Sequence, residues 1–105
     1  MRTKNKDNIT LEEFKKEFEK AGKGNCFSEE GFKALYNALT WLESDMGEPL
    51  MLDIPWICSS FKEYPNYGAY LNDNGDPKET VWVIWVNWYR LLEPNFNGRV
   101  IIGNI

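Results

Sequence analysis

Apolar residues in the first half of the chain recur at the three- and four-residue spacing of amphipathic helices. A first helix is predicted over 11–21, because Thr10 followed by Glu13 forms a capping-box sequence and Gly22 is a common helix stop. Its apolar stripe consists of Leu11, Phe14, Phe18 and Ala21.

A second helix is predicted over 29–46 by the same signals. Ser28 is a favourable N-cap, two glutamates in the first turn suit the positive end of the helix dipole, and Gly47 ends the pattern. The apolar stripe of this helix consists of Phe32, Leu35, Tyr36, Leu39, Leu42 and Met46.

The spacing of apolar residues changes after the second helix. Apolar residues alternate with other residues over 50–59, which predicts a strand, and Pro55 places that strand at a sheet edge or at a bulge. The segment 64–78 is rich in Pro, Asn, Gly and Asp and is predicted to be an irregular loop.

Two more strands are predicted toward the end of the chain. The segment 80–89 is dense in β-branched and aromatic residues, and 99–102 follows a turn signal at 97–98. Two helices followed by three strands predict the α+β class, with both helices packed on one face of a small three-stranded antiparallel sheet. Because consecutive strands are usually neighbours, the strand around Trp85 is expected to be central.

The length of 105 residues suits a single domain, 1–105, and leaves no room for a second one. Residues 1–8 are polar and lack the apolar core of a signal peptide, so we expect a flexible tail and a cytoplasmic location. The most apolar run, 81–92, is shorter than the roughly 20 residues that a membrane helix needs. No membrane partner is therefore expected.

The chain has a formal net charge of −4 and contains no histidine. Direct nucleic-acid binding needs clustered Lys and Arg, so an acidic chain is expected to bind a basic protein surface instead. The absence of histidine removes the commonest base for Ser and Cys nucleophiles, and we expect no enzyme. The remaining candidates for acid-base chemistry are Glu48 and Asp53.

Cys26 and Cys58 are the only cysteines, which is too few for a zinc site or a disulfide scaffold. The sequence predicts two free, buried thiols, with a disulfide as the alternative. The segment 73–76 resembles a calcium loop only superficially, because it lacks the spaced ligands and the closing Glu of an EF-hand. No metal and no cofactor are expected.

Aromatic residues are the most informative feature, since five Trp, five Tyr and six Phe provide more apolar area than two helices cover. In an extended strand Trp82 and Trp88 point to one face, and Trp85 and Tyr89 point to the other. Two interpretations of the face away from the helices stay open: the segment 64–78 folds over it, or a partner binds there.

Two further groups of aromatic residues are candidates for contacts. Trp41 falls nearly opposite the apolar stripe of the second helix, which makes it a binding residue unless it packs under the first helix. Tyr64, Tyr67 and Tyr70 are spaced three apart, as stacking residues are in some single-strand nucleic-acid sites. Few basic residues accompany them, so structural tyrosines or a protein contact are favoured.

The segment 27–64 has a recognisable pattern. It reads Phe-Ser-Glu-Glu-Gly-Phe at 27–32, Met-Gly-Glu at 46–48, Leu-Asp-Ile-Pro-Trp-Ile-Cys at 52–58 and Phe-Lys-Glu-Tyr at 61–64. This pattern resembles a group of small acidic proteins that bacteriophages and other mobile elements encode, although Pro55 and Trp56 depart from it. The resemblance includes no catalytic motif.

The resemblance implies an accessory protein that binds and inhibits a host defence complex, a protein or ribonucleoprotein assembly of a CRISPR or restriction system. The alternative is a homodimeric scaffolding protein that uses the Trp-rich strand face as its interface. The contact residues expected for the inhibitor are Trp41, Trp82, Trp88, Tyr67, Tyr70, Glu43, Asp45 and Glu48.

Overall fold

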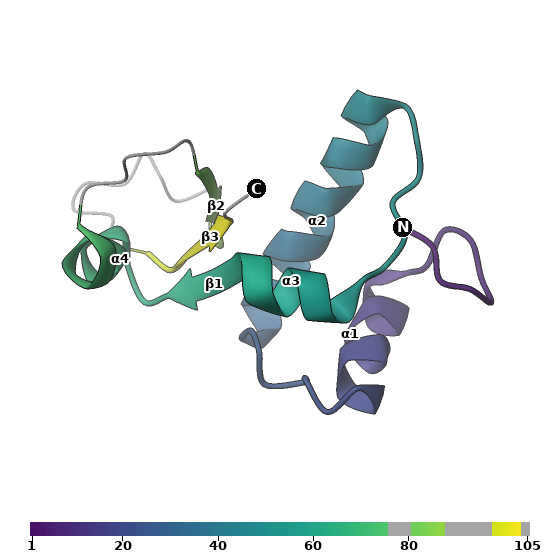
Figure 1. Ribbon diagram of the computed structural model, residues 1–105, viewed down its shortest axis with the longest axis horizontal. Coiled ribbons are helices and arrows are strands. Elements are labelled where there is room, and N and C mark those ends of the chain that lie inside the picture. Colours follow the sequence, from purple (N-terminus) through teal and green to yellow (C-terminus); the bar gives the residue numbers. More distant parts are fainter. Residues whose placement is uncertain (76–80, 88–97, 104–105) are drawn as a thin grey trace.

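A computed structural model of the protein describes residues 1–75, 81–87 and 98–103, and within them the chain forms four helices and three strands (Figure 1). The predicted α+β class is confirmed, with two N-terminal helices preceding a three-stranded antiparallel sheet. The elements are α1 (Leu11–Lys20), α2 (Glu29–Met46), α3 (Ile54–Ser60), β1 (Phe61–Tyr64), α4 (Tyr67–Asn74), β2 (Trp82–Trp85) and β3 (Val100–Gly103).

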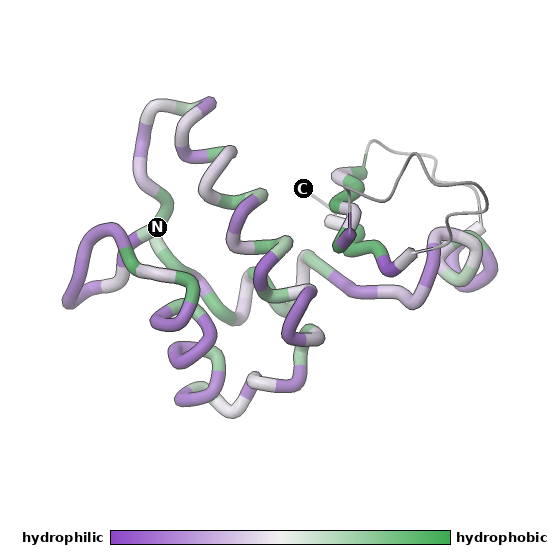
Figure 2. The backbone as a smooth tube through the Cα atoms, turned by 180° about the vertical axis from the view of Figure 1, so that it is seen from behind, coloured by the Kyte–Doolittle hydropathy of each residue, from purple (hydrophilic) through white to green (hydrophobic). Residues whose placement is uncertain are grey.

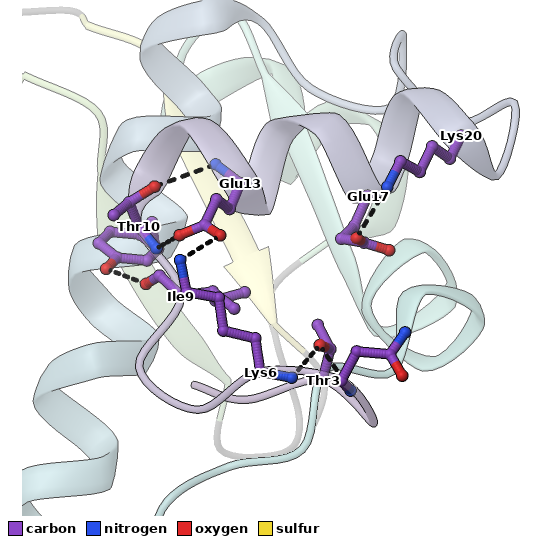
Figure 3. Close-up of polar contacts among 9 residues, drawn as sticks. Thr3, Lys6, Ile9, Thr10, Glu13, Glu17 and Lys20 are labelled. Atoms are coloured by element: carbon purple, nitrogen blue, oxygen red, sulfur yellow. Dashed lines mark hydrogen bonds and ion pairs between the residues drawn. The ribbon is translucent and has the colours of Figure 1, made fainter.

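The N-terminal caps of α1 and α2 are those that the sequence predicts. At α1 the Thr10 hydroxyl accepts a hydrogen bond from the Glu13 N–H, and the Glu13 carboxylate accepts one from the Thr10 N–H, which completes the capping box (Figure 3). At α2 the Ser28 hydroxyl accepts from the Gly31 N–H at 2.9 Å. Gly47 ends α2 in the left-handed conformation, with φ of 72°.

The strand predicted over 50–59 is wrong, because most of this segment forms the helix α3. The side chain of Asp53 caps the helix by accepting a hydrogen bond from the Trp56 N–H at 3.1 Å. Pro55 lies in the first turn, where its missing N–H costs no helical hydrogen bond. The residues that α3 packs against the core are Ile54, Ile57 and Cys58.

The irregular loop predicted over 64–78 is also wrong for the residues that the structure describes. Tyr64 ends β1, and α4 begins three residues later with Asn66 as its N-cap. The Asn66 side chain accepts a hydrogen bond from the Ala69 N–H at 2.8 Å. The amide cap therefore favours a helix in a segment whose composition alone indicates turns.

The sheet has the order β1-β3-β2, so the expectation that the strand around Trp85 is central is wrong. The central strand β3 is apolar at every position before Gly103 and is buried throughout. Such a run is typical of a strand that is covered on both faces. In the observed register, Phe61 and Trp82 flank Gly103, while Tyr64 and Trp85 flank Val100.

The strand predicted over 80–89 is shorter in the structure. β2 covers Trp82–Trp85, the next two residues form a turn, and positions 80, 88 and 89 lie outside the described residues. Position 97 of the predicted turn also lies outside them. The antiparallel pairing of β2 with β3 is the one that the predicted hairpin requires.

Two hydrophobic clusters cover the two faces of the sheet, and Figure 1 shows α2 and α4 on opposite sides of the strands. α2 lies between α1 and the sheet. Figure 2 shows hydrophobic positions concentrated at the strands and alternating with hydrophilic ones along α2. Buried in the larger cluster are Phe14, Phe18, Phe27, Phe32, Leu35, Leu39, Ile57, Phe61, Ile84 and Ile101, and buried in the smaller are Tyr64, Tyr70, Val100 and Ile102.

The segment 1–8, for which a flexible tail is expected, makes several contacts with the rest of the fold. Met1 is buried in the larger cluster. Arg2 pairs with Met51 in a parallel bridge, with the Arg2 N–H donating to the Leu50 carbonyl at 2.9 Å. The segment therefore covers the chain that connects α2 to α3.

The carboxylate of Glu63 connects three parts of the fold. The Ser28 N–H and hydroxyl donate to its two oxygens at 2.8 and 2.7 Å, and the Arg99 Nε donates at 2.5 Å. The Glu63 side chain is only 4% exposed. A Cβ atom at Gly31 would overlap this carboxylate, so a side chain at this position would require the Glu63 side chain to move away from the start of α2. The Glu63 cluster, defined as Glu63, Ser28, Gly31 and Arg99, thus joins β1, the start of α2 and the residue before β3.

Lowering the pH is expected to weaken the start of α1. The pKa of Glu13 is lowered from 4.5 to about 2, first by the hydrogen bond from Lys6 and then by the Thr10 N–H. The contribution of Glu13 to stability is therefore complete above pH 4.5 and is lost as the pH falls through about 2. A carbon-13 NMR titration of the Glu13 carboxyl group checks this value.

Lys6→Ala should raise the Glu13 pKa toward 4.5, whereas Lys4→Ala, the matched control at an exposed lysine nearby, should leave it low. Titration of Glu13 near 4.5 in the unchanged protein would contradict the capping geometry.

Removing the carboxylate of Glu63 is expected to destabilise the fold. Glu63→Ala should lower the free energy of unfolding by about 3 kcal/mol, because it leaves a desolvated N–H at the α2 terminus and an unpaired guanidinium. Urea unfolding monitored by circular dichroism measures the change. The matched control is Glu30→Gln, which removes an exposed carboxylate in the first turn of α2 and should cost less than about 1 kcal/mol. Equal decreases in the free energy of unfolding for the two variants would show that Glu63 stabilises the fold only through its charge near the helix N-terminus.

Candidate functional site

The exposed side of α2 provides one wall of a groove. Residues at three- and four-residue spacing lie on the same face of a helix, and here Ala34 and Ala38 alternate with longer side chains. Both alanines are half-buried and pack against the larger cluster, so the helix backbone lies close to the groove floor. The α2 residues along this wall are Glu30, Lys33, Ala34, Asn37, Ala38 and Trp41.

The opposite wall comes from β2 and the turn that follows it. The space between the two walls is about 540 Å³, within the roughly 300–1,000 Å³ of typical ligand sites. Apolar and aromatic side chains dominate the lining on the strand side, whereas on the α2 side Ala34, Ala38 and Trp41 are interspersed with Glu30, Lys33 and Asn37. We call this space the α2–β2 groove, and its residues on the strand side are Trp82, Val83, Ile84, Trp85, Val86 and Asn87.

Trp41 is the most exposed large apolar side chain that the structure describes, at 61%. The alternative interpretation, that Trp41 packs under the first helix, is wrong. A Trp side chain buries roughly 150–250 Å² in contacts, so covering the exposed part at ~25 cal/mol per Å² is worth about 3 kcal/mol. That energy is in the range of a binding hot spot.

The tryptophans of β2 are half-buried and contribute to both faces of the sheet. Trp82 packs against the larger cluster, with its ring centroid 5.9 Å from that of Phe61. Trp85 packs against the smaller cluster, 6.1 Å from the Tyr67 ring. The opposite orientation of these two side chains agrees with the sequence prediction. Trp88 lies outside the described residues.

The tyrosines at three-residue spacing form a packed group. Ring centroids of Tyr64 and Tyr70 are 5.4 Å apart, and those of Tyr67 and Tyr70 are 5.6 Å apart. Tyr70 is 6% exposed, so the expectation that it points outward to a partner is wrong. Tyr67 is half-buried between Tyr70 and Trp85. The described part of this segment, 64–75, thus folds over the second sheet face through α4, in agreement with one of the two interpretations of that face.

The three acids expected beside the aromatics occupy different surroundings. Asp45 is exposed and lies one turn after Trp41 on the same helix face. Glu43 points to another side of α2, where its carboxylate pairs with the amino group of Met1. Glu48 is exposed in the connection that follows α2. Only Asp45 is therefore placed to act together with Trp41.

Carboxylate and thiol side chains are spread out over the part of the chain that the structure describes. Within 1–75, 81–87 and 98–103, no three carboxylate or thiol side chains gather as metal ligands. The Asp53 carboxylate is occupied as the α3 N-cap. In the same ranges no helix has the length and apolar character needed to cross a bilayer.

Two features of the site escape prediction from the sequence. Ala34 and Ala38 were not singled out, although small residues at four-residue spacing allow a neighbouring wall to approach a helix. Exposed apolar residues outside the groove also occur, with Met51 at 52%, Met46 at 48% and Trp56 at 42%. These three provide internal controls for the role of Trp41.

Comparisons of the chain with protein-family models, with curated proteins and with solved structures find no match. The resemblance to phage-encoded proteins therefore stays a prediction.

Truncating the two tryptophans that face the groove is expected to have unequal effects on stability. Trp41→Ala should lower the free energy of unfolding by only about 1 kcal/mol, because most of the indole is already exposed in the folded protein. Trp82→Ala should cost about 2 kcal/mol, because it leaves a space beside Phe61. Urea unfolding of both variants measures the difference. A large loss for Trp41→Ala would mean that its side chain packs against the fold.

Proposed function

We propose that this protein is a non-catalytic binding module that holds a segment of a partner protein in the α2–β2 groove. The observation that supports the proposal is the exposure of Trp41 at the edge of an apolar groove of about 540 Å³. Leaving an indole in water costs free energy that a partner recovers on binding, and Trp is among the commonest hot-spot residues.

The groove favours a particular kind of partner segment. Ala34 and Ala38 provide a shallow apolar floor, and the half-buried indole of Trp82 borders it, so an apolar side chain is the best occupant. Asp45 follows Trp41 on the same face of α2, and the chain is acidic as a whole. A basic side chain next to the apolar one would pair with Asp45 and would be attracted by the net charge.

We propose further that the partner belongs to a host defence complex and that the protein inhibits this complex by occupying one of its protein surfaces. The support is the resemblance of segment 27–64 to phage and mobile-element proteins, together with the acidic charge and the groove. CRISPR and restriction complexes bind nucleic acid through basic surfaces, to which an acidic protein of this kind is attracted.

A homodimer built on the strand face remains the alternative. It has less support, because both tryptophans of β2 are already half-covered. Trp82 contacts Phe61, and Trp85 contacts Tyr67. A partner bound at Trp41 leaves these contacts intact.

Substituting Trp41 is expected to remove the partner and to leave the fold unchanged. Trp41→Ala should weaken binding about 100-fold, which corresponds to the roughly 3 kcal/mol gained by covering the indole. Affinity capture from a host lysate with quantitative mass spectrometry compares this variant with the unchanged protein. Met46→Ala on another face of α2 and Trp56→Ala on α3 are matched controls and should retain the partner.

Retention of the same proteins by all variants would reject the groove as the binding site. Light scattering at micromolar concentration separates the homodimer from the binding module, because a stable dimer has twice the mass of the monomer.

The proposal that the protein inhibits a host defence complex is tested by plating phage on host strains that each carry one CRISPR or restriction system. Expression of the protein should raise plating on at least one strain, with loss for Trp41→Ala and retention for Met46→Ala. Unchanged plating on every strain would reject host-defence inhibition and would leave the groove to be judged by the capture experiment.

A further inference from the structure

Cys26 and Cys58 are 32 positions apart in sequence and meet in the fold. Their sulphur atoms are 2.9 Å apart, and one thiol donates a hydrogen bond to the other. Cys26 lies in the connection between α1 and α2, and Cys58 lies in the short helix α3. Both side chains are half-buried and pack against the edge of the larger cluster. Small reagents in water therefore reach the pair.

We propose that Cys26 and Cys58 are a covalent modification site, at which a disulfide oxidant converts the two thiols into an intramolecular disulfide and a thiol reductant restores them. A disulfide bond is ~2.05 Å long, so the two sulphur atoms need to approach by only about 0.9 Å. Cys26 lies in a connection between helices and Cys58 in a helix of seven residues, and a shift of this size at such positions disturbs little regular structure. This inference does not depend on the proposed binding function.

The oxidation proceeds by two exchange steps with a small-molecule disulfide such as oxidised glutathione. One cysteine loses its proton and attacks a sulphur of the oxidant, which forms a mixed disulfide and releases one glutathione thiolate. The second cysteine then attacks the protein sulphur of the mixed disulfide, forms the Cys26–Cys58 bond and releases the second glutathione. The protein loses two electrons and two protons, and the oxidant is reduced to two thiols.

The surroundings of Cys58 favour its neutral thiol in the reduced state. Burial, followed by the hydrogen bond with Cys26, raises the pKa of Cys58 to about 12. The positive charge of Lys23 acts in the opposite direction and favours the thiolate. Attack by Cys58 on the oxidant is therefore slow at neutral pH, while closure of the mixed disulfide is favoured because the two sulphur atoms are already in contact.

The cross-link would change how two parts of the fold are held together. The cross-link joins the connection that precedes α2 to α3, and the resulting covalent loop includes the whole of α2. A loop of this length restricts the unfolded chain, and the resulting rise in the thermal midpoint is on the order of 10 °C. A rise in the thermal midpoint on oxidation would therefore indicate that the disulfide has formed.

Incubation of the full chain with oxidised glutathione, followed by alkylation of remaining thiols and intact-mass analysis, tests the proposal. The expected product is a monomer that has lost the mass of two hydrogen atoms, resists alkylation at both cysteines and melts about 10 °C higher than the reduced protein. Addition of dithiothreitol should return both thiols and the original midpoint.

The variants Cys26→Ser and Cys58→Ser are the controls. Each should stop at the mixed disulfide with glutathione, and the double variant Cys26→Ser/Cys58→Ser should show the same midpoint with and without oxidant. Accumulation of the mixed disulfide in the unchanged protein, formation of disulfide-linked dimers, or two thiols that stay open to alkylation would each overturn the proposal.

Discussion

The Glu63 carboxylate is the point on which the arrangement of helices and strands depends. It extends from β1 to the start of α2, accepts two hydrogen bonds from Ser28 and pairs with Arg99, so one side chain links the end of a helix to the sheet. Desolvating a carboxylate is costly unless such partners are present. Gly31 permits the close approach, because any side chain there would occupy the space of the carboxylate. Because α2 forms one wall of the α2–β2 groove, this contact also helps to position that wall.

The helices α1 and α2 were predictable from the sequence, because each has an N-cap and a helical apolar stripe that agree. The segments in which capping residues and apolar spacing indicate different structures were not predictable. The caps at Thr10 and Ser28 fixed both long helices at their starting residues. In the segment 50–59 the alternation of apolar residues favours a strand, but the Asp53 cap and Pro55 in the first turn favour a helix. The core-facing side of that helix carries Ile54, Ile57 and Cys58, while Trp56 is exposed. Short capped helices such as α4 lack a periodic apolar stripe, and there only the Asn66 cap indicated a helix.

The same distinction between local signals and long-range contacts applies to the residues of the candidate site. The exposure of Trp41 follows from helical geometry alone, so the sequence predicts it correctly. The burial of Tyr70 depends on α4 folding onto the second sheet face, and the contact between Cys26 and Cys58 depends on α3 lying beside the connection from α1 to α2. For Tyr70 the three-residue spacing of the tyrosines leaves both a packed tyrosine and a protein contact open, and only the fold decides between them. The cysteine contact joins residues 32 positions apart, so no local pattern indicates it. The role of Glu63 was hidden for the same reason, although it lies in the Phe-Lys-Glu-Tyr motif at 61–64.

The position of β3 in the middle of the sheet has a consequence for the order of events during synthesis. β1 and β2 do not pair with each other, and both obtain their ladder of backbone hydrogen bonds from residues 100–103. A ribosome therefore completes α1, α2 and both outer strands before the strand that joins them emerges. Until then the amide groups of the outer strands have only water as a partner, and the tryptophans of β2 lack the central strand beside them. Contacts of such long sequence separation also form late in folding.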